Sequence, residues 1–213
     1  MRDKIGLLGG TFNPVHKGHV KLGLNILDAF GLDKIFYILS ANPPHKNSTN
    51  LAPVAIRWEM LKCALHSFSR LIPCDIEMNR PTYSWTWQTI KELKEEHRDS
   101  QFYFISGSEG FLKIKTWKKY GYLLETLPFI VVLRHRQDEN KVTKLLQGEG
   151  IVPASRERAG EKMPCICLHA YDAEELSISS TKIRNMIHNS IPVTRFVDQG
   201  VLKIMEENKL YES

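Results

Sequence analysis

The fold is decided around one run near the N-terminus: Gly9-Gly10-Thr11-Phe12-Asn13-Pro14-Val15-His16-Lys17-Gly18-His19. The apolar residues 4–9 before it have the length of a buried strand. Residues 17–30 after it carry Val20, Leu24 and Leu27 at helical spacing, with Gly31 as a common helix stop. A strand, a tight turn and a helix in this order predict a parallel sheet whose strands are connected through helices.

The same alternation continues along the chain. Further strands are predicted at residues 34–39, 71–78, 101–106, 128–134 and 165–170, and further helices at 53–68, 86–97, 181–188 and 194–208. Right-handed crossovers then give an α/β fold with a doubly wound, Rossmann-like parallel sheet, which binds ligands at the carboxyl ends of its strands. We expect a single domain over residues 1–213, with a small C-terminal helical part at 179–213 and a long loop at 148–164.

Composition excludes several classes of protein. The chain has 213 residues, of which 42% are hydrophobic and 25% charged, which is typical of a globular protein and not of a disordered one. The net charge of +5 suits a phosphate-bearing ligand but forms no dense basic stripe, so no nucleic-acid partner is expected. With no apolar run of about 18 residues and no signal-peptide pattern, we expect a cytoplasmic protein with no membrane partner. The four cysteines are then reduced thiols.

The run after the first strand has the chemistry of an anion site. Two glycines let a ligand approach the backbone closely. His16 and His19 stand on one face at the start of a helix, where unpaired N–H groups and the helix dipole favour negative charge. A zinc site on the two histidines is an alternative, although no third ligand is evident. The run matches neither the P-loop nor the Gly-x-Gly-x-x-Gly motif.

A second candidate anion site lies near the C-terminus. Ser179, Ser180 and Thr181 stand at the start of a predicted helix, where hydroxyl side chains cap free N–H groups. They could serve as a cap alone. Arg184 follows one turn later, where its guanidinium could hold the same anion through two hydrogen bonds.

The run 9–19 resembles the (T/H)xGH-type signature of the nucleotidyltransferase superfamily. Within it, the chain is similar to the bacterial nicotinate-nucleotide adenylyltransferase family over nearly its whole length. The other matching blocks are Pro44-His45-Lys46, Arg80, Ser84-Trp85-Thr86, Gly107-Ser108-Glu109, Trp117-Lys118, Arg134, Ile178-Ser179-Ser180-Thr181-Lys182-Ile183-Arg184 and Lys209-Leu210-Tyr211. The order and spacing of these blocks together carry the resemblance.

The resemblance implies adenylyl transfer from ATP to nicotinate mononucleotide, giving deamido-NAD and pyrophosphate in NAD biosynthesis. Magnesium would be bound mainly through the ATP phosphates, with no metal site made by the protein. The implied catalytic residues are His16, His19, Lys46 and Arg184. The implied ATP-binding residues are Gly9, Gly10, Thr11, Phe12, Gly18, Gly107, Glu109, Arg134, Ser179, Ser180 and Thr181. The implied pyridine-nucleotide-binding residues are Asn13, His45, Ser84, Trp85, Thr86 and Trp117.

The sequence leaves alternatives open. The chain could prefer nicotinamide mononucleotide, belong with the phosphopantetheine or FMN enzymes of the superfamily, or be a non-catalytic nucleotide sensor on the same fold; a homo-oligomer is also open. Lys46 could instead belong to a solvated turn, Trp117 could be a core residue, as it would be in most proteins, and Arg134 could be a surface charge. Three positions depart from the family pattern: Asn13 and Glu109 replace frequent aspartates, and Trp85 replaces a tyrosine at the pyridine end.

Overall fold

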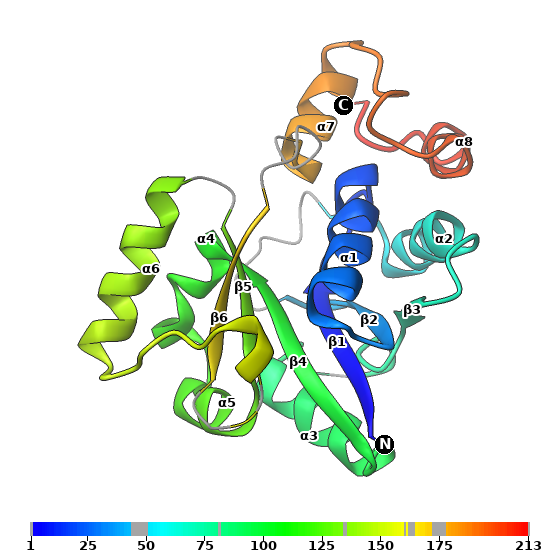
Figure 1. Ribbon diagram of the computed structural model, residues 1–213. Helices are drawn as coiled ribbons and strands as arrows, with labels where there is room; N and C mark the ends of the chain where they lie inside the picture. The colour runs from blue at the N-terminus through cyan, green and yellow to red at the C-terminus, as the bar shows by residue number, and fades with distance from the viewer. Residues whose placement is uncertain are drawn as a thin grey trace. The chain divides into compact units, whose positions relative to one another are not determined.

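The computed structural model describes residues 2–43, 51–80, 82–133, 136–159, 161, 165–171 and 178–212, without the side chains of 136 and 137. A six-stranded sheet has the order β3-β2-β1-β4-β5-β6 and is flanked by helices (Figure 1). The strands are β1 (Asp3–Gly10), β2 (Lys34–Leu39), β3 (Leu71–Cys74), β4 (Ser100–Gly107), β5 (Phe129–Leu133) and β6 (Ile166–Ala170). The predicted doubly wound α/β class is confirmed, because the strand order reverses its direction at β1.

The helices are α1 (Lys17–Phe30), α2 (Val54–Leu65), α3 (Thr86–Glu96), α4 (Ser108–Phe111), α5 (Tyr120–Thr126), α6 (Arg136–Gly148), α7 (Ser180–His188) and α8 (Gln199–Glu207), with 3-10 turns η2 (Ile114–Thr116) and η3 (Arg156–Arg158). The helix predicted at 194–208 begins only at Gln199, because the Asp198 carboxylate accepts the Gly200 N–H and caps it there. The strand predicted at 71–78 ends at Cys74 in a turn. The predicted loop at 148–164 contains η3, and the sequence did not predict α4, α5 or α6.

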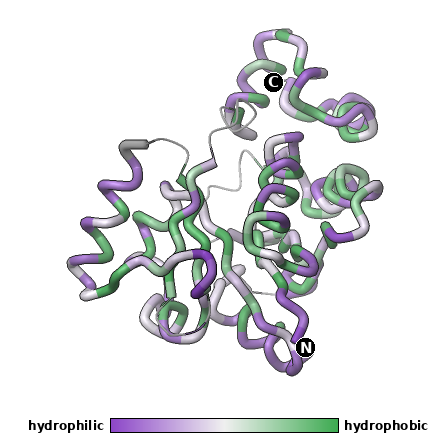
Figure 2. Tube along the Cα trace, viewed as in Figure 1, coloured by the Kyte–Doolittle hydropathy of each residue, from purple (hydrophilic) through white to green (hydrophobic). Residues whose placement is uncertain are grey.

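The chain divides into two compact units, of which the first comprises Met1–Gly9, Ile26–Ile35 and Trp85–Asp172. Within it, β1 pairs with β4, β4 with β5 and β5 with β6, all parallel. Every residue of β5 is buried, and Figure 2 shows the hydrophobic colouring of these strands. Helices α4 and α6 pack against β5. These apolar runs form strands because both of their faces are covered.

The second unit comprises Gly10–Asn25, Phe36–Ser84 and Ala173–Ser213. Helix α2 packs against α8, and Gly200 lies so close to the Cys63 thiol that a Cβ would not fit there. The Tyr37 side chain is fully buried, and its hydroxyl passes over Gly23 to donate to the His19 carbonyl oxygen at 2.8 Å. Gly23 therefore makes room for the hydrogen bond that fixes the first turn of α1.

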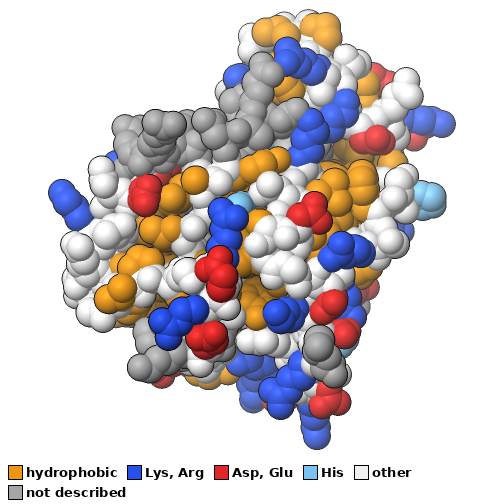
Figure 3. Space-filling view, in the orientation of Figure 1, with side chains coloured by type: hydrophobic (Ala, Val, Ile, Leu, Met, Phe, Trp, Pro, Cys, Tyr) orange, Lys and Arg blue, Asp and Glu red, His pale blue; other side chains and the backbone are white. Residues whose placement is uncertain are grey.

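The described surface has mixed charge. On the face shown in Figure 3, the basic and acidic side chains of the described residues are interspersed. None of the helices that the structure describes is both long and apolar enough to span a bilayer.

Candidate functional site

His16 and His19 lie together at the start of α1 in the second unit. Their rings stack with centroids 3.7 Å apart and an interplanar angle of 29°, and the Phe12 ring meets His19 edge-on at 5.2 Å. His16 is buried, whereas His19 is half-buried. The spacing of three residues therefore places both imidazoles on one face, as predicted.

The tautomer of His19 follows from one hydrogen bond. Its Nδ1 accepts the backbone N–H of His16 at 3.2 Å, and a nitrogen that accepts a hydrogen bond carries no proton. The proton of the neutral ring therefore sits on Nε2, which is a donor.

The prediction that the N-terminus of α1 offers a set of unpaired N–H groups is wrong in part. The Lys17 N–H donates to the Phe196 carbonyl oxygen at 2.9 Å, and the His19 N–H donates to the His16 carbonyl oxygen at 2.9 Å. The Lys17 ammonium also donates to the Thr194 carbonyl oxygen. The segment before α8, distant in sequence, therefore caps this helix.

Helix α7 is hydrogen-bonded to Asn13 and Pro14, just before α1 in the second unit. Ser179 is the N-cap residue, and its hydroxyl accepts the Lys182 N–H at 3.2 Å, so the predicted cap is confirmed. The Ser180 hydroxyl donates to the Pro14 carbonyl oxygen at 2.8 Å. Arg184 donates to the Asn13 carbonyl oxygen at 2.8 Å and to the Thr181 hydroxyl at 3.3 Å. The structure thus brings His16, His19 and Arg184 into one part of this unit.

The Asn13 side chain serves the fold. It is 2% exposed, and its Oδ1 accepts both the Ala52 N–H at 3.0 Å and the Tyr211 hydroxyl at 2.6 Å. Burial raises the pKa of Tyr211, so this hydroxyl remains a donor. Asn13 therefore connects the signature run with the start of α2 and the C-terminal tail, and its predicted contact with the pyridine nucleotide stays a prediction.

Arg57 is a buried residue behind the signature run that the sequence did not single out. Its guanidinium is 2% exposed and donates to four backbone carbonyl oxygens, those of Ala52, Thr11, Ser40 and Ala41, at 2.8–3.1 Å. Burial lowers its pKa. Arg57 thus joins the chain beyond β1 and the chain beyond β2 to the start of α2. Its signal in the sequence is a cation on the apolar stripe of a helix, four residues before Leu61.

The first unit holds three of the predicted ATP-binding residues, Gly9, Gly107 and Glu109, at or just after the ends of β1 and β4, whereas Gly10, Thr11, Phe12 and Gly18 belong to the second unit. These two strands run side by side, and a Cβ added at Gly9 or Gly107 would meet only open space. The buried Ser108 hydroxyl donates to the Asp138 carboxylate on α6 at 2.8 Å, which fixes the turn after β4. Glu109 follows with its side chain exposed.

Three of the six predicted pyridine-nucleotide-binding residues, Trp85, Thr86 and Trp117, lie in the first unit. Thr86 begins α3 after the N-cap residue Trp85, and Trp117 is half-buried with its ring edge-on to Phe104 at 5.7 Å. Ser84 belongs to the second unit, where it is buried and exchanges two hydrogen bonds with the Asn42 backbone. His45, Lys46 and Arg134 lie outside the described residues.

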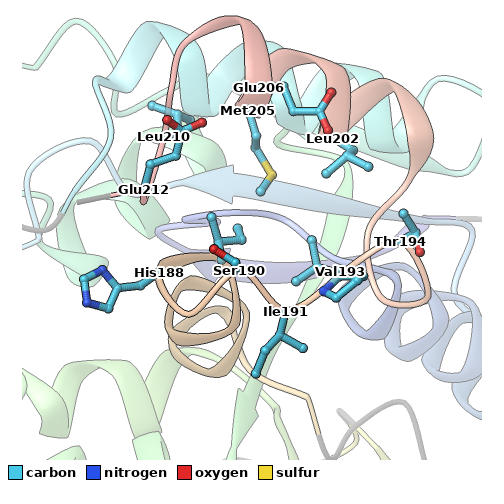
Figure 4. Close-up of a pocket in the computed structure, with 12 residues that line it drawn as sticks. His188, Ser190, Ile191, Val193, Thr194, Leu202, Met205, Glu206, Leu210 and Glu212 are labelled. Atoms are coloured by element: carbon cyan, nitrogen blue, oxygen red, sulfur yellow. The ribbon is translucent and has the colours of Figure 1, made fainter.

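Two clefts are found in the second unit. One has a volume of about 460 Å³, and its lining includes three basic residues, Arg184, His188 and Lys209, beside apolar ones. The other, of about 540 Å³, lies among α7, α8 and the loop between them and contains none of the predicted site residues (Figure 4). In it, the Met205 side chain points from α8 towards this loop. Within the described ranges, no three His, Cys, Asp or Glu side chains are grouped to hold a metal ion.

Comparisons with known proteins agree with this arrangement. The family model described as cytidylyltransferase-like matches residues 7–186. A probable nicotinate-nucleotide adenylyltransferase of Clostridium botulinum is 31% identical over 97% of this chain and 98% of its own length, and one of Clostridium perfringens is 29% identical over 98% of both chains.

Solved structures share the fold. The nicotinic acid mononucleotide adenylyltransferase of Plasmodium falciparum in complex with NaAD superposes with a TM-score of 0.78 at 19% identity, covering 99% of this chain and 98% of the other. A putative nicotinate-nucleotide adenylyltransferase of Vibrio parahaemolyticus superposes with a TM-score of 0.65 at 16% identity, covering 99% and 96% of the two chains.

Proposed function

The chain belongs to the cytidylyltransferase-like family, and on this premise we propose that it transfers the adenylyl group of ATP to nicotinate mononucleotide, giving deamido-NAD and pyrophosphate. Curated relatives that match nearly the full chain carry the name of this activity. The observation that carries the proposal is the pair of stacked imidazoles with a fixed Nε2–H donor, in the same unit as Arg184, which lies one turn into α7.

The reaction needs charge stabilisation and positioning more than proton transfer. A 5′-phosphate oxygen of the mononucleotide attacks the α-phosphorus of ATP, the bond from that phosphorus to the bridging oxygen breaks, and pyrophosphate leaves with the electron pair. The attacking phosphate is already anionic at pH 7, so no general base is required. Donors that are fixed before the reaction are the most effective means of stabilising the charge that develops.

His19 fits that requirement. Its Nε2–H is oriented by the hydrogen bond at Nδ1 and by the stacked ring of His16, so no reorganisation is needed when negative charge grows on the phosphate. Arg184 donates one hydrogen bond to the Asn13 carbonyl oxygen and one to the Thr181 hydroxyl, and these two bonds fix the plane of its guanidinium. Its remaining N–H groups point to a role in binding phosphate oxygens. Lys46 is proposed to hold the mononucleotide phosphate, by resemblance alone.

Magnesium would enter with ATP. Mg²⁺ commonly retains several waters and binds through nucleotide phosphates and few protein groups, and the described carboxylates and histidines form no cluster that would compete for it. The ion would neutralise charge on the pyrophosphate that leaves. The cytoplasmic location and the oligomeric state stay predictions.

The preference for nicotinate over nicotinamide mononucleotide is proposed from the start of α3. The first turn of this helix has no acidic residue that could repel a carboxylate or accept from an amide. A ring held against Trp117 with its substituent towards Thr86 would meet backbone donors. An amide there would bring its own N–H₂ against donors, and an unpaired polar group costs about 1–3 kcal/mol.

The test is a pyrophosphate-release assay on the purified protein with ATP and each pyridine mononucleotide in turn. We expect turnover with both and a kcat/KM at least about tenfold higher for the nicotinate form. Equal values, or a preference for the amide, would contradict the substrate assignment while leaving adenylyl transfer intact. Binding of ATP without pyrophosphate release under either condition would support the non-catalytic sensor instead.

A further inference from the structure

Two consecutive lysines in the first unit lie on two tryptophans. The Lys118 ammonium is 4.8 Å from the ring centroid of Trp85, and the Lys119 ammonium is 3.6 Å from the ring centroid of Trp87. Trp85 is the N-cap residue of α3, and Trp87 lies in its first turn. Cation–π pairs of this geometry connect the segment after Trp117 to the start of α3.

The two lysines differ in how firmly they are held. Lys119 adopts a left-handed conformation (φ 57°) as the N-cap residue of α5, and its ammonium lies well within contact of the Trp87 face. Both lysines are exposed, and the Lys118 ammonium stands farther from the half-buried Trp85 ring than the Lys119 ammonium does from Trp87. An ammonium has three N–H donors. While an aromatic face holds it in position, it can still donate hydrogen bonds to an anion.

Lys118 is also the neighbour of Trp117, the residue proposed to stack on the pyridine ring. Its ammonium and the Trp85 backbone stand at the same end of α3, where the first turn contains no carboxylate to neutralise the cation. Tryptophan is the strongest of the aromatic side chains as a partner for a cation, so the replacement of the usual tyrosine by Trp85 strengthens this placement.

We propose that Lys118, held on Trp85, is a specificity-determining residue that favours a carboxylate over an amide on the pyridine ring. The inference rests on the proposed function and adds to the backbone donors of α3 a side chain that discriminates by charge. An ammonium attracts the carboxylate of nicotinate mononucleotide, whereas the neutral amide gains little from it and brings N–H groups that the ammonium cannot accept.

The experiment compares the Lys118→Met and Lys119→Met variants in full-length protein. Methionine keeps an unbranched stem over the tryptophan and removes only the charge. For each variant, kcat/KM is measured with nicotinate and with nicotinamide mononucleotide at saturating ATP. We expect Lys118→Met to lower the nicotinate-to-nicotinamide ratio about tenfold, mainly through KM for the nicotinate form, and Lys119→Met to change it less than about twofold.

Lys118→Arg serves as the rescue variant, because it keeps the charge and the stacking, and we expect it to restore most of the ratio. A ratio unchanged in Lys118→Met, or lowered equally in Lys119→Met, would overturn the inference, as would a wild-type protein that shows no preference for the carboxylate. If the wild type transfers no adenylyl group to either mononucleotide, the proposed function itself fails, and this outcome is visible before any variant is made.

Discussion

Replacement of Arg57 by methionine tests how the loops around the signature run are held in the second unit. Methionine fills most of the volume of the arginine stem and is tolerated in a helix, so α2 itself is preserved. The change removes the donors to the carbonyl oxygens of Thr11, Ser40, Ala41 and Ala52. The variant therefore isolates the contribution of the buried guanidinium.

The expected loss follows from the four hydrogen bonds. Four charged hydrogen bonds at about 1.5–3 kcal/mol each amount to roughly 6–12 kcal/mol before any compensation. Against this, the variant no longer has to desolvate a guanidinium that is 2% exposed, which offsets several kcal/mol. The balance matches the usual result of removing one partner from a buried charged network, about 3–5 kcal/mol in the free energy of unfolding. For a chain of this length, that lowers Tm by about 10 °C.

The measurement is chemical and thermal unfolding of the wild type, Arg57→Met, Arg57→Lys and a surface control. We expect Arg57→Lys to recover little, because one ammonium cannot reach four carbonyls in different directions. Arg158→Met is the control: Arg158 is exposed and pairs with Glu161 at 3.2 Å, so its loss should stay below about 1 kcal/mol. A loss below about 1 kcal/mol in Arg57→Met would refute the reasoning, because the four bonds would then contribute nothing net.

Three further predictions concern catalysis and pH. His19→Ala should lower kcat about 10²–10³-fold with little change in ATP affinity, since the lost donor acts on developing charge; a near wild-type kcat would remove His19 from the mechanism. Lys46→Ala should raise KM for the mononucleotide selectively, and steady-state kinetics with each substrate varied would reverse the assignment if KM for ATP rose instead. Burial, aided by the Arg156 guanidinium, lowers the pKa of the 3% exposed His169 to about 4. The unfolded chain therefore binds a proton at this site near pH 6.5, whereas the folded chain does not. His169 alone should lower the free energy of unfolding by about 2 kcal/mol from pH 7 to pH 5, so the fall measured in His169→Gln should be smaller than that of the wild type by about this amount.

Some elements could be predicted from the sequence because their signals are local. Helix α1 has the predicted bounds, since its apolar spacing and the glycine after it both act within a few residues. Strand β2 likewise coincides with an apolar run buried along its length. The sequence pattern does not indicate α6, because this helix lies in a polar segment. It also places the start of α8 too early, because the helix begins where the Asp198 carboxylate accepts the Gly200 N–H, and the spacing of apolar residues carries no information about such a cap.

The sequence by itself determined the fold class, the pair of histidines on one face of α1 and the hydroxyl cap of α7, because each depends on residues within one turn or one strand. The tertiary structure alone decided how those residues are used. The capping of α1 joins Lys17 and Phe196, which are 179 positions apart (196 − 17), and the contact of Tyr211 with Asn13 joins residues 198 positions apart. The four carbonyls on Arg57 lie 5 to 46 positions from it. Such contacts depend on how the chain returns to the same place, and no local pattern encodes that. The same holds for the contact between Lys118 and Trp85. The tryptophan ring positions the ammonium only because the folded chain brings α3 and the segment after Trp117 together.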